Sequence, residues 1–174
     1  MITKLVLLFM LLSLRYCQAQ VVFHKVDDFL AQSGQTVNKV KPALFNPKIL
    51  HVTDSNGLRK YVASNSIWGF KNEEGEIYRV YRNDFYRVIE VGPLIVYSHD
   101  LGKTQQTCFS IDPTMPINPL SKRALIREAK NNSCMRTIKN KLNESGHSVA
   151  ASAKMGQNYL INSVIKETGC NPFQ

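Results

Sequence analysis

The sequence predicts an α+β fold, an antiparallel meander of about five to seven strands packed by two or three C-terminal helices. Between residues 48 and 98, short runs of β-branched and aromatic residues alternate with turn residues at intervals of about 8–12 positions. From residue 120 onward the apolar residues recur instead with a helical period. Because the strands precede the helices and do not alternate with them, the pattern is typical of the α+β class.

The first nineteen residues have the pattern of a secretory signal peptide. Lys4 precedes a ten-residue stretch, 5–14, with one polar member, and Cys17-Gln18-Ala19 ends in a small residue. We expect cleavage after Ala19 and a single α+β domain over residues 20–174. The apolar stretch is shorter than the roughly 20 residues that span a bilayer, so we expect the cleaved chain not to span a membrane. Lipid attachment at Cys17 remains an alternative.

The mature chain has 174 − 19 = 155 residues, a typical length for one domain. The signal segment removes Lys4 and Arg15, so 20 basic and 13 acidic side chains remain and the net charge is +7. Residues 121–174 hold nine basic and three acidic side chains. In an exported protein, such a field favours an anionic glycan or an envelope protein as partner, and nucleic acid is not the expected partner. A solvated helical surface without a partner is the alternative.

We expect residues 20–119 to be mostly strand and loop. Residues 21–23 suit an edge strand, residues 26–30 a short helical turn, and Pro42 and Pro47 an irregular connection. Asn56-Gly57 predicts a hairpin turn, because these residues tolerate positive φ. The predicted strands of the meander are 48–53, 58–63, 66–71, 76–82, 85–91 and 94–98. A further strand over 106–111 lies within a proline-rich stretch, 100–119.

We expect residues 120–170 to be helical. The apolar stripe of 121–130 and that of 133–143 point in different directions, so we predict two helices there, with Ser121 capping the first. A last helix is predicted over 153–167.

Three cysteines remain after cleavage, Cys108, Cys134 and Cys170. An oxidising compartment permits a disulfide, and an odd count leaves one thiol over in a monomer. The sequence does not choose among the three pairs, and three unpaired cysteines are an alternative.

Catalytic, cofactor and metal-binding motifs are not expected. The four histidines are dispersed, and none has a second ligand-type residue at metal-binding spacing. We therefore expect a protein without enzymatic activity and without a cofactor. A small secreted hydrolase acting on glycan or nucleic acid, with its histidines and carboxylates brought together by the fold, is the alternative function.

An aromatic and cationic surface is the main candidate for binding. Tyrosine, tryptophan and arginine anchor recognition surfaces, and strand alternation distributes them over both sheet faces, so some must reach solvent or another chain. The alternative is a core with arginine stems lying over the rings. The candidate residues are Trp68, Tyr78, Arg79, Tyr81, Arg82, Tyr86 and Arg87 on the strands, and Arg123 and Arg127 on the first predicted helix.

The run Ser66-Ile67-Trp68-Gly69-Phe70-Lys71, followed by Gly75, Ile77-Tyr78-Arg79 and Tyr86-Arg87-Val88, resembles a group of small uncharacterised exported bacterial proteins. These share a W-G-[FY]…G…Y-R…Y hairpin core and C-terminal helices, and the resemblance covers roughly residues 58–143. It implies a periplasmic or outer-envelope setting and assigns no catalytic residue. The function expected from the sequence is thus that of an exported envelope or secreted binding protein.

Overall fold

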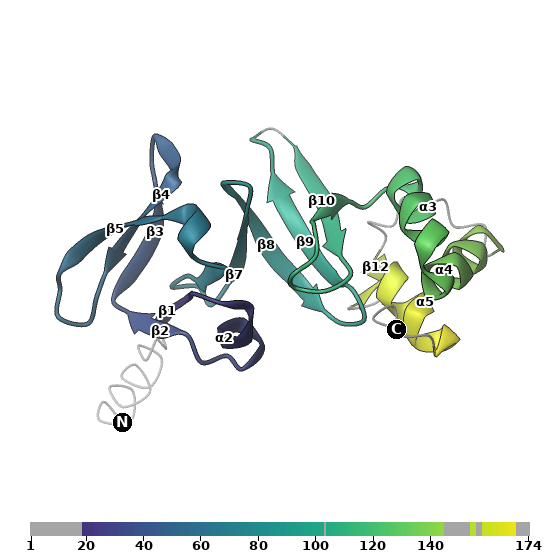
Figure 1. Cartoon of the computed structure of the whole chain (residues 1–174), viewed down its shortest axis with the longest axis horizontal. Helices are drawn as coiled ribbons and strands as arrows, with labels where there is room; N and C mark the ends of the chain where they lie inside the picture. Colours follow the sequence, from purple (N-terminus) through teal and green to yellow (C-terminus); the bar gives the residue numbers. More distant parts are fainter. Residues whose placement is uncertain (1–18, 103, 145–153, 156–157, 170–174) are drawn as a thin grey trace, which may run out of the picture.

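The computed structural model describes residues 19–102, 104–144, 154–155 and 158–169. These residues form an eight-stranded antiparallel sheet, a three-stranded sheet, a two-stranded hairpin and four α-helices, which confirms the α+β class. The strands are more numerous than predicted, and one helix, α2 (Val26–Leu30), precedes most of them. The three-stranded sheet and the C-terminal helices lie at opposite ends of the long axis, with the larger sheet between them (Figure 1).

The larger sheet has the strand order β11-β10-β9-β8-β7-β6-β1-β2. The strand predicted at residues 21–23 is confirmed, but it is not an edge strand, because β1 pairs with both β2 and β6. All four residues of β1 are buried, as expected of a central strand covered on both faces. The strands are β1 (Gln20–Phe23), β2 (Gln35–Val37), β6 (Gly69–Lys71), β7 (Ile77–Tyr81), β8 (Asp84–Val91), β9 (Ile95–Asp100), β10 (Gln105–Ser110) and β11 (Asn118–Pro119).

The smaller sheet consists of β3 (Lys39–Ala43), β4 (Asn46–Thr53) and β5 (Arg59–Ala63), in that order. A single meander through these strands is therefore wrong: a short 3-10 helix, η1 (Ser64–Ser66), separates β5 from β6, and the two strands belong to different sheets. The irregular connection predicted around Pro42 and Pro47 is also wrong, because Pro47 lies on β4. Pro42 lies on β3, an edge strand of its sheet, where no neighbouring strand needs the missing N–H.

Alternation along the strands gives the larger sheet two faces. We call one side face A. Its residues either lie opposite one another on paired strands or are two positions apart on one strand, and they include Val22, Phe70, Tyr78, Arg87 and Val96. Face A packs against the smaller sheet through one apolar cluster, which includes Phe70 and Leu50, and against the C-terminal helices through another, which includes Val96 and Ile138.

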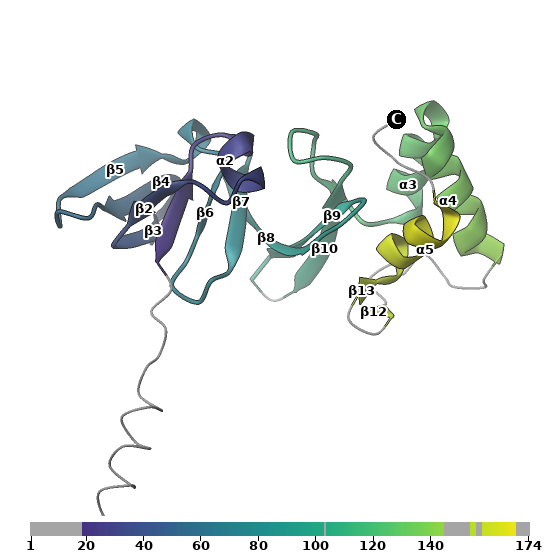
Figure 2. The ribbon, with the colours of Figure 1, turned by 90° about the horizontal axis from the view of Figure 1, so that it is seen from below.

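Face B is the opposite side of the larger sheet, with Phe23, Arg79, Tyr86, Tyr97 and Cys108. Its apolar cluster contains Phe29 of α2, and Ile117 of the segment after β10 packs against it. Figure 2 shows α2 beside one end of this sheet, with the C-terminal helices at the other end. The described residues thus form three apolar clusters and not one central core.

The hairpin turns follow from local sequence. Gly57 and Gly75 both have φ of +80°, which glycine adopts without steric cost. Between β7 and β8, Arg82 (φ 54°) and Asn83 (φ 66°) both occupy the left-handed region, as a two-residue hairpin turn of type I′ requires. The turn therefore keeps the twist of the two strands, and it places the Arg82 side chain at the exposed tip.

The C-terminal helices are α3 (Lys122–Asn131), α4 (Ser133–Glu144) and α5 (Leu160–Thr168). The predicted break between the first two is confirmed, and Ser121 caps α3 by accepting the Ala124 N–H at 3.2 Å. The last helix begins later than predicted, because β12 (Lys154–Met155) pairs with β13 (Asn158–Tyr159) before it.

The structure restricts the disulfide pairing. Cys108 is free and buried on β10, and Cys134 of α4 is disulfide-bonded. The two pairs that use Cys108 are thereby excluded, while Cys170 lies outside the described residues. Burial raises the pKa of the Cys108 thiol to about 11, so it stays protonated and unreactive at neutral pH.

Candidate binding groove between the two sheets

The nine candidate residues from the sequence fall in three separate places. Face B and the β7–β8 turn carry Trp68, Arg79, Tyr81, Arg82 and Tyr86, while face A carries Tyr78 and Arg87. Arg123 and Arg127 are exposed on α3 at the far end of the molecule. The fold therefore does not assemble the nine residues into a single surface.

Arg79 lies inside the molecule, with 4% of its surface exposed. Its guanidinium donates to the hydroxyls of Tyr97 (3.0 Å) and Ser110 (3.3 Å) and to the Met115 carbonyl (2.9 Å). It thereby ties β7 to β9, to β10 and to the segment after β10. These three bonds are directed to groups of its own chain, so Arg79 corresponds to the core alternative and not to an exposed binding residue.

Trp68 is half-buried and packs against α2. Its ring stacks on Phe29 with centroids 4.1 Å apart, and its indole N–H donates to the Pro113 carbonyl at 2.9 Å. The Tyr86 ring stacks on His99 at 4.3 Å. These contacts correspond to the core alternative for Trp68, whereas Arg82 is exposed and places its guanidinium 5.2 Å from the centre of the Tyr81 ring.

On face A, Glu76 joins Tyr78 to Arg87. The Tyr78 hydroxyl donates to Glu76 Oε2 at 2.8 Å, and Arg87 donates to Glu76 Oε1 at 2.6 Å. These two hydrogen bonds hold the pKa of Glu76 below its ordinary value, and the bond from Tyr78 has the larger effect. Burial, together with the bond to Glu76, raises the pKa of Tyr78 to about 12. Tyr78 is therefore a protonated donor with a fixed ring orientation.

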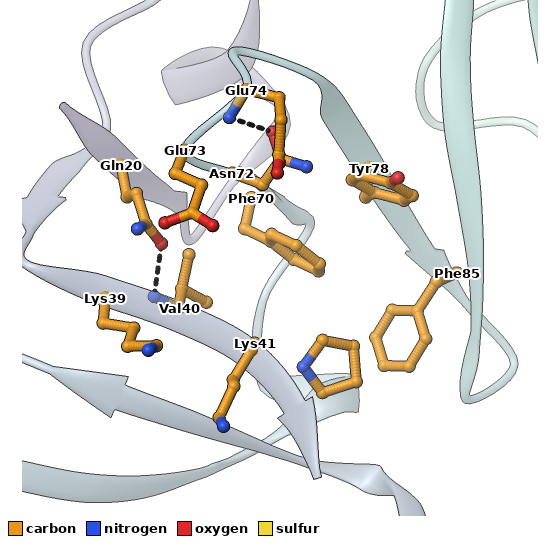
Figure 3. Close-up of a pocket in the computed structure, with 11 residues that line it drawn as sticks. Gln20, Lys39, Val40, Lys41, Phe70, Asn72, Glu73, Glu74, Tyr78 and Phe85 are labelled. Carbon is orange, nitrogen blue, oxygen red and sulfur yellow. Dashed lines mark hydrogen bonds between the residues drawn. The ribbon is translucent and has the colours of Figure 1, made fainter. Parts of the chain in front are cut away.

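The Tyr78 ring forms part of the wall of a groove between face A and β3. The groove has a volume of about 400 Å³. Phe70 stacks on Tyr78 with centroids 5.3 Å apart, and Phe85 packs edge-to-face against Phe70 at 5.9 Å. Figure 3 shows these three rings on one side of the groove, which is lined by Gln20, Lys39, Val40, Lys41, Pro42, Phe70, Asn72, Glu73, Glu74, Tyr78 and Phe85.

The exposed Glu73 and Glu74, from the turn between β6 and β7, give the groove one acidic rim (Figure 3). Lys39 and Lys41 of β3 border the opposite edge, but they alternate with the buried Val40, so their side chains lie on the other face of that strand. The side chain of Gln20 connects the two sheets by accepting the Val40 N–H at 2.6 Å. The groove is thus apolar along its aromatic wall and acidic at one rim.

Of the groove residues, sequence reasoning selected Tyr78. Phe85 is in a predicted strand, but no local pattern distinguishes it from other half-buried aromatic residues. Lys39 and Lys41 lie in a segment predicted to be irregular, and they reach the groove through the packing of the two sheets. The alternation of lysine with Val40 and Pro42 was the available signal for a strand with one charged face.

The cations of α3 and α4 surround a shallow hollow at the other end of the molecule. It has a volume of about 300 Å³ and is lined by Ile126, Lys130, Arg136 and Lys139. Arg127 bonds to the side chain of Asn118 and lies 3.5 Å from Glu128. This basic helical surface is consistent with the charge asymmetry of the sequence, and it is open and shallow compared with the groove.

The described histidines lie apart from one another. His24 bonds to Gln35, His51 packs against Tyr61 on the smaller sheet, and His99 stacks on Tyr86; His147 is outside the described residues. Across the described ranges, no group of three or more histidine, cysteine, aspartate or glutamate side chains is arranged to hold a metal ion. No helix in those ranges is long and apolar enough to cross a membrane.

Comparison of the chain with models of known protein families, with curated proteins and with solved structures finds no match.

Proposed function

We propose that this chain is an exported binding protein whose groove between face A and β3 holds an extended segment of another envelope protein. The observation that carries the proposal is the combination of an aromatic wall with an acidic rim in a groove of about 400 Å³. A polypeptide segment offers apolar side chains for Tyr78 and Phe85 and basic side chains for Glu73 and Glu74. Anchors in such a pocket dominate the affinity of an interface, while charged rims contribute to specificity.

Two observations support the extracytoplasmic setting. Residues 1–19 have the three-part pattern of a secretory signal. The disulfide at Cys134 is a bond that persists in oxidising compartments and is rare in the cytosol. The envelope is therefore the place where we look for the partner.

The groove residues are suited to binding more than to hydrolysis. A general acid or base works best with a pKa near the operating pH. Here the pKa of Tyr78 is raised to about 12, and that of the neighbouring Glu76 is lowered. Histidine is not among the residues that line the groove. The small-hydrolase alternative therefore gains no support from this site.

The test is site-specific photo-crosslinking in the source cells. A benzoylphenylalanine in place of Phe85 would sit in the groove, and one in place of the exposed Leu101 serves as the control. We expect a crosslink to one envelope protein from position 85 and not from position 101, with mass spectrometry identifying the segment attached. The same products from both positions, or none from position 85, would contradict the proposal.

A second variant tests the rim. Glu73→Lys combined with Glu74→Lys reverses two exposed charges, and Asp27→Lys combined with Glu144→Lys makes the same change in net charge away from the groove. We expect the first pair to abolish the crosslink and the control pair to leave it. Raising the salt from ~50 to ~500 mM screens exposed charges, so retention at high salt would indicate that the aromatic wall provides most of the affinity.

A further inference from the structure

The outer face of the smaller sheet, turned away from the larger sheet, has a regular cationic surface. Strand pairing places Lys41, His51 and Tyr61 directly opposite one another in one row, and Lys39, Thr53 and Arg59 in the next. Neighbours within a row are about 5 Å apart across the strands, and the rows are about 7 Å apart along them. These six residues, together with Val52 and Lys60, line a hollow of about 280 Å³. We call the surface formed by the six residues the cationic sheet face.

The positive charge of this face is not neutralised within the described part of the chain. Lys39, Lys41 and Arg59 form no ion pair there, whereas Lys60 lies 3.1 Å from Asp54. Carboxylates do not line the hollow. Three positive charges on one face of the sheet therefore create a local field that attracts an anion.

Tyr61 adds an exposed aromatic ring beside these charges. It is 76% exposed on β5, an edge strand, so its ring is open to a ligand. The His51 ring meets it edge-to-face, with centroids 4.9 Å apart and an interplanar angle of 88°. Such a contact orients the tyrosine ring without covering both of its sides. An exposed, oriented ring next to cations is suited to a ligand with both a flat apolar surface and negative charge.

We infer that the cationic sheet face binds an acidic polysaccharide. Lys39, Lys41 and Arg59 would pair with carboxylate or sulfate groups on successive sugars, and Tyr61 would stack on the apolar side of one sugar ring. The two rows present charges at intervals that an extended polymer can follow. A single-stranded nucleic acid is a poorer match, because its successive bases use several aromatic platforms and this face offers one exposed ring.

This site is separate from the groove, although Lys39 and Lys41 border both. The test therefore uses Arg59 and Tyr61, which line the cationic sheet face and not the groove. Arg59→Glu combined with Tyr61→Ser is compared with Arg123→Glu combined with Arg127→Glu on α3, whose arginines are exposed at the other end of the molecule. Far-ultraviolet circular dichroism checks that each variant is folded.

The assay is calorimetric titration of residues 20–174 with four polymers, namely polygalacturonate, heparin, neutral dextran and an oligothymidylate of the same charge as the heparin. We expect binding to polygalacturonate and heparin, none to dextran, and a loss of affinity of about tenfold or more in the Arg59 and Tyr61 variant alone, because attraction becomes repulsion. Tyr61→Ser by itself should weaken binding without changing its salt dependence, since it removes no charge.

Three results would overturn the inference: no binding to either acidic polysaccharide, an equal loss in the α3 variant, or tighter binding of the oligothymidylate. The outcome is distinguishable from that of the groove experiment. The Glu73 and Glu74 variant, which should abolish the protein crosslink, leaves Arg59 and Tyr61 in place and should retain polysaccharide binding.

Discussion

Replacement of Arg79 tests the proposed architecture most directly. Its guanidinium makes three hydrogen bonds, to Tyr97, Ser110 and the Met115 carbonyl, and lies 5.5–5.9 Å from the centres of three aromatic rings. We expect Arg79→Met to destabilise the protein strongly, because one side chain joins β7, β9, β10 and the segment that follows β10. The methionine side chain is similar in length to the aliphatic part of arginine, so the loss of stability would come mainly from the lost hydrogen bonds and not from a large cavity.

The magnitude follows from what is lost and what is retained. Hydrogen bonds to a charged group contribute about 1.5–3 kcal/mol each. The hydroxyls of Tyr97 and Ser110 would still be hydrogen-bonded to each other, at 2.9 Å. Methionine also avoids the desolvation cost of a buried guanidinium. We therefore expect a loss of about 2–4 kcal/mol in the free energy of unfolding, out of the roughly 5–15 kcal/mol typical of a domain. The melting temperature would fall by about 4–16 °C.

Urea denaturation followed by fluorescence measures this loss, because Trp68 is the one tryptophan of the chain and its ring centre lies 5.9 Å from the Arg79 guanidinium. Arg79→Lys should be intermediate, since lysine keeps the charge without the planar fork of donors. Arg82→Met, at the exposed hairpin tip, is the matched control and should change stability by less than about 0.5 kcal/mol. A loss below about 1 kcal/mol for Arg79→Met, or one equal to the control, would refute the reasoning.

Three further predictions concern other buried or paired groups. Asn162→Leu should cost about 1–3 kcal/mol in thermal unfolding, because the Asn162 amide accepts the Leu94 N–H at 3.0 Å and that N–H would be left unpaired, whereas the Leu94 carbonyl would keep the Gly92 N–H at 3.2 Å; the exposed Asn140→Leu should be nearly neutral. The lowered pKa of Glu76 stabilises the fold above its ordinary value of 4.5, and this contribution is lost as the pH falls through the folded-state value. Glu76→Gln should therefore lose less stability than the wild type between pH 6 and 3 in acid titrations followed by circular dichroism, and an unchanged profile would count against the pairing. Alkylation should leave Cys108 unlabelled in the native protein and label it once the chain is unfolded, because the thiol is buried; labelling of Cys108 in the native protein would contradict its burial.

Local features of the fold were accessible from the sequence. Asn56-Gly57 predicted a turn, Asn132 and Ser133 a break between two helices, and Ser121 a helix cap, and all three are present. Each depends on interactions within a few residues, such as the positive φ of Gly57 or the bond from Ala124 N–H to Ser121. The physical cause of such features lies in neighbouring residues, so a single sequence is enough to predict them.

The place of each strand within a sheet was not accessible in this way. β1 has apolar side chains on both faces, but its pairing with β6, some 50 residues later, depends on the whole arrangement. The separation of β3, β4 and β5 from the main sheet likewise depends on packing across face A. For the candidate site, the same packing brings Lys39 and Lys41 opposite Glu73 and Glu74, which no local pattern indicates.

By itself the sequence determined the α+β class, the helix boundaries near Ser121 and Asn132, the concentration of positive charge after residue 120 and the aromatic-rich strands. The tertiary structure alone decided that Arg79 is buried among hydroxyls and rings, that Tyr78 lines a groove, and that Lys41, His51 and Tyr61 form one row on an outer face. The reason is that alternation assigns a side chain to one of two faces, whereas the pairing and stacking of distant strands decide which face meets a core, a groove or solvent.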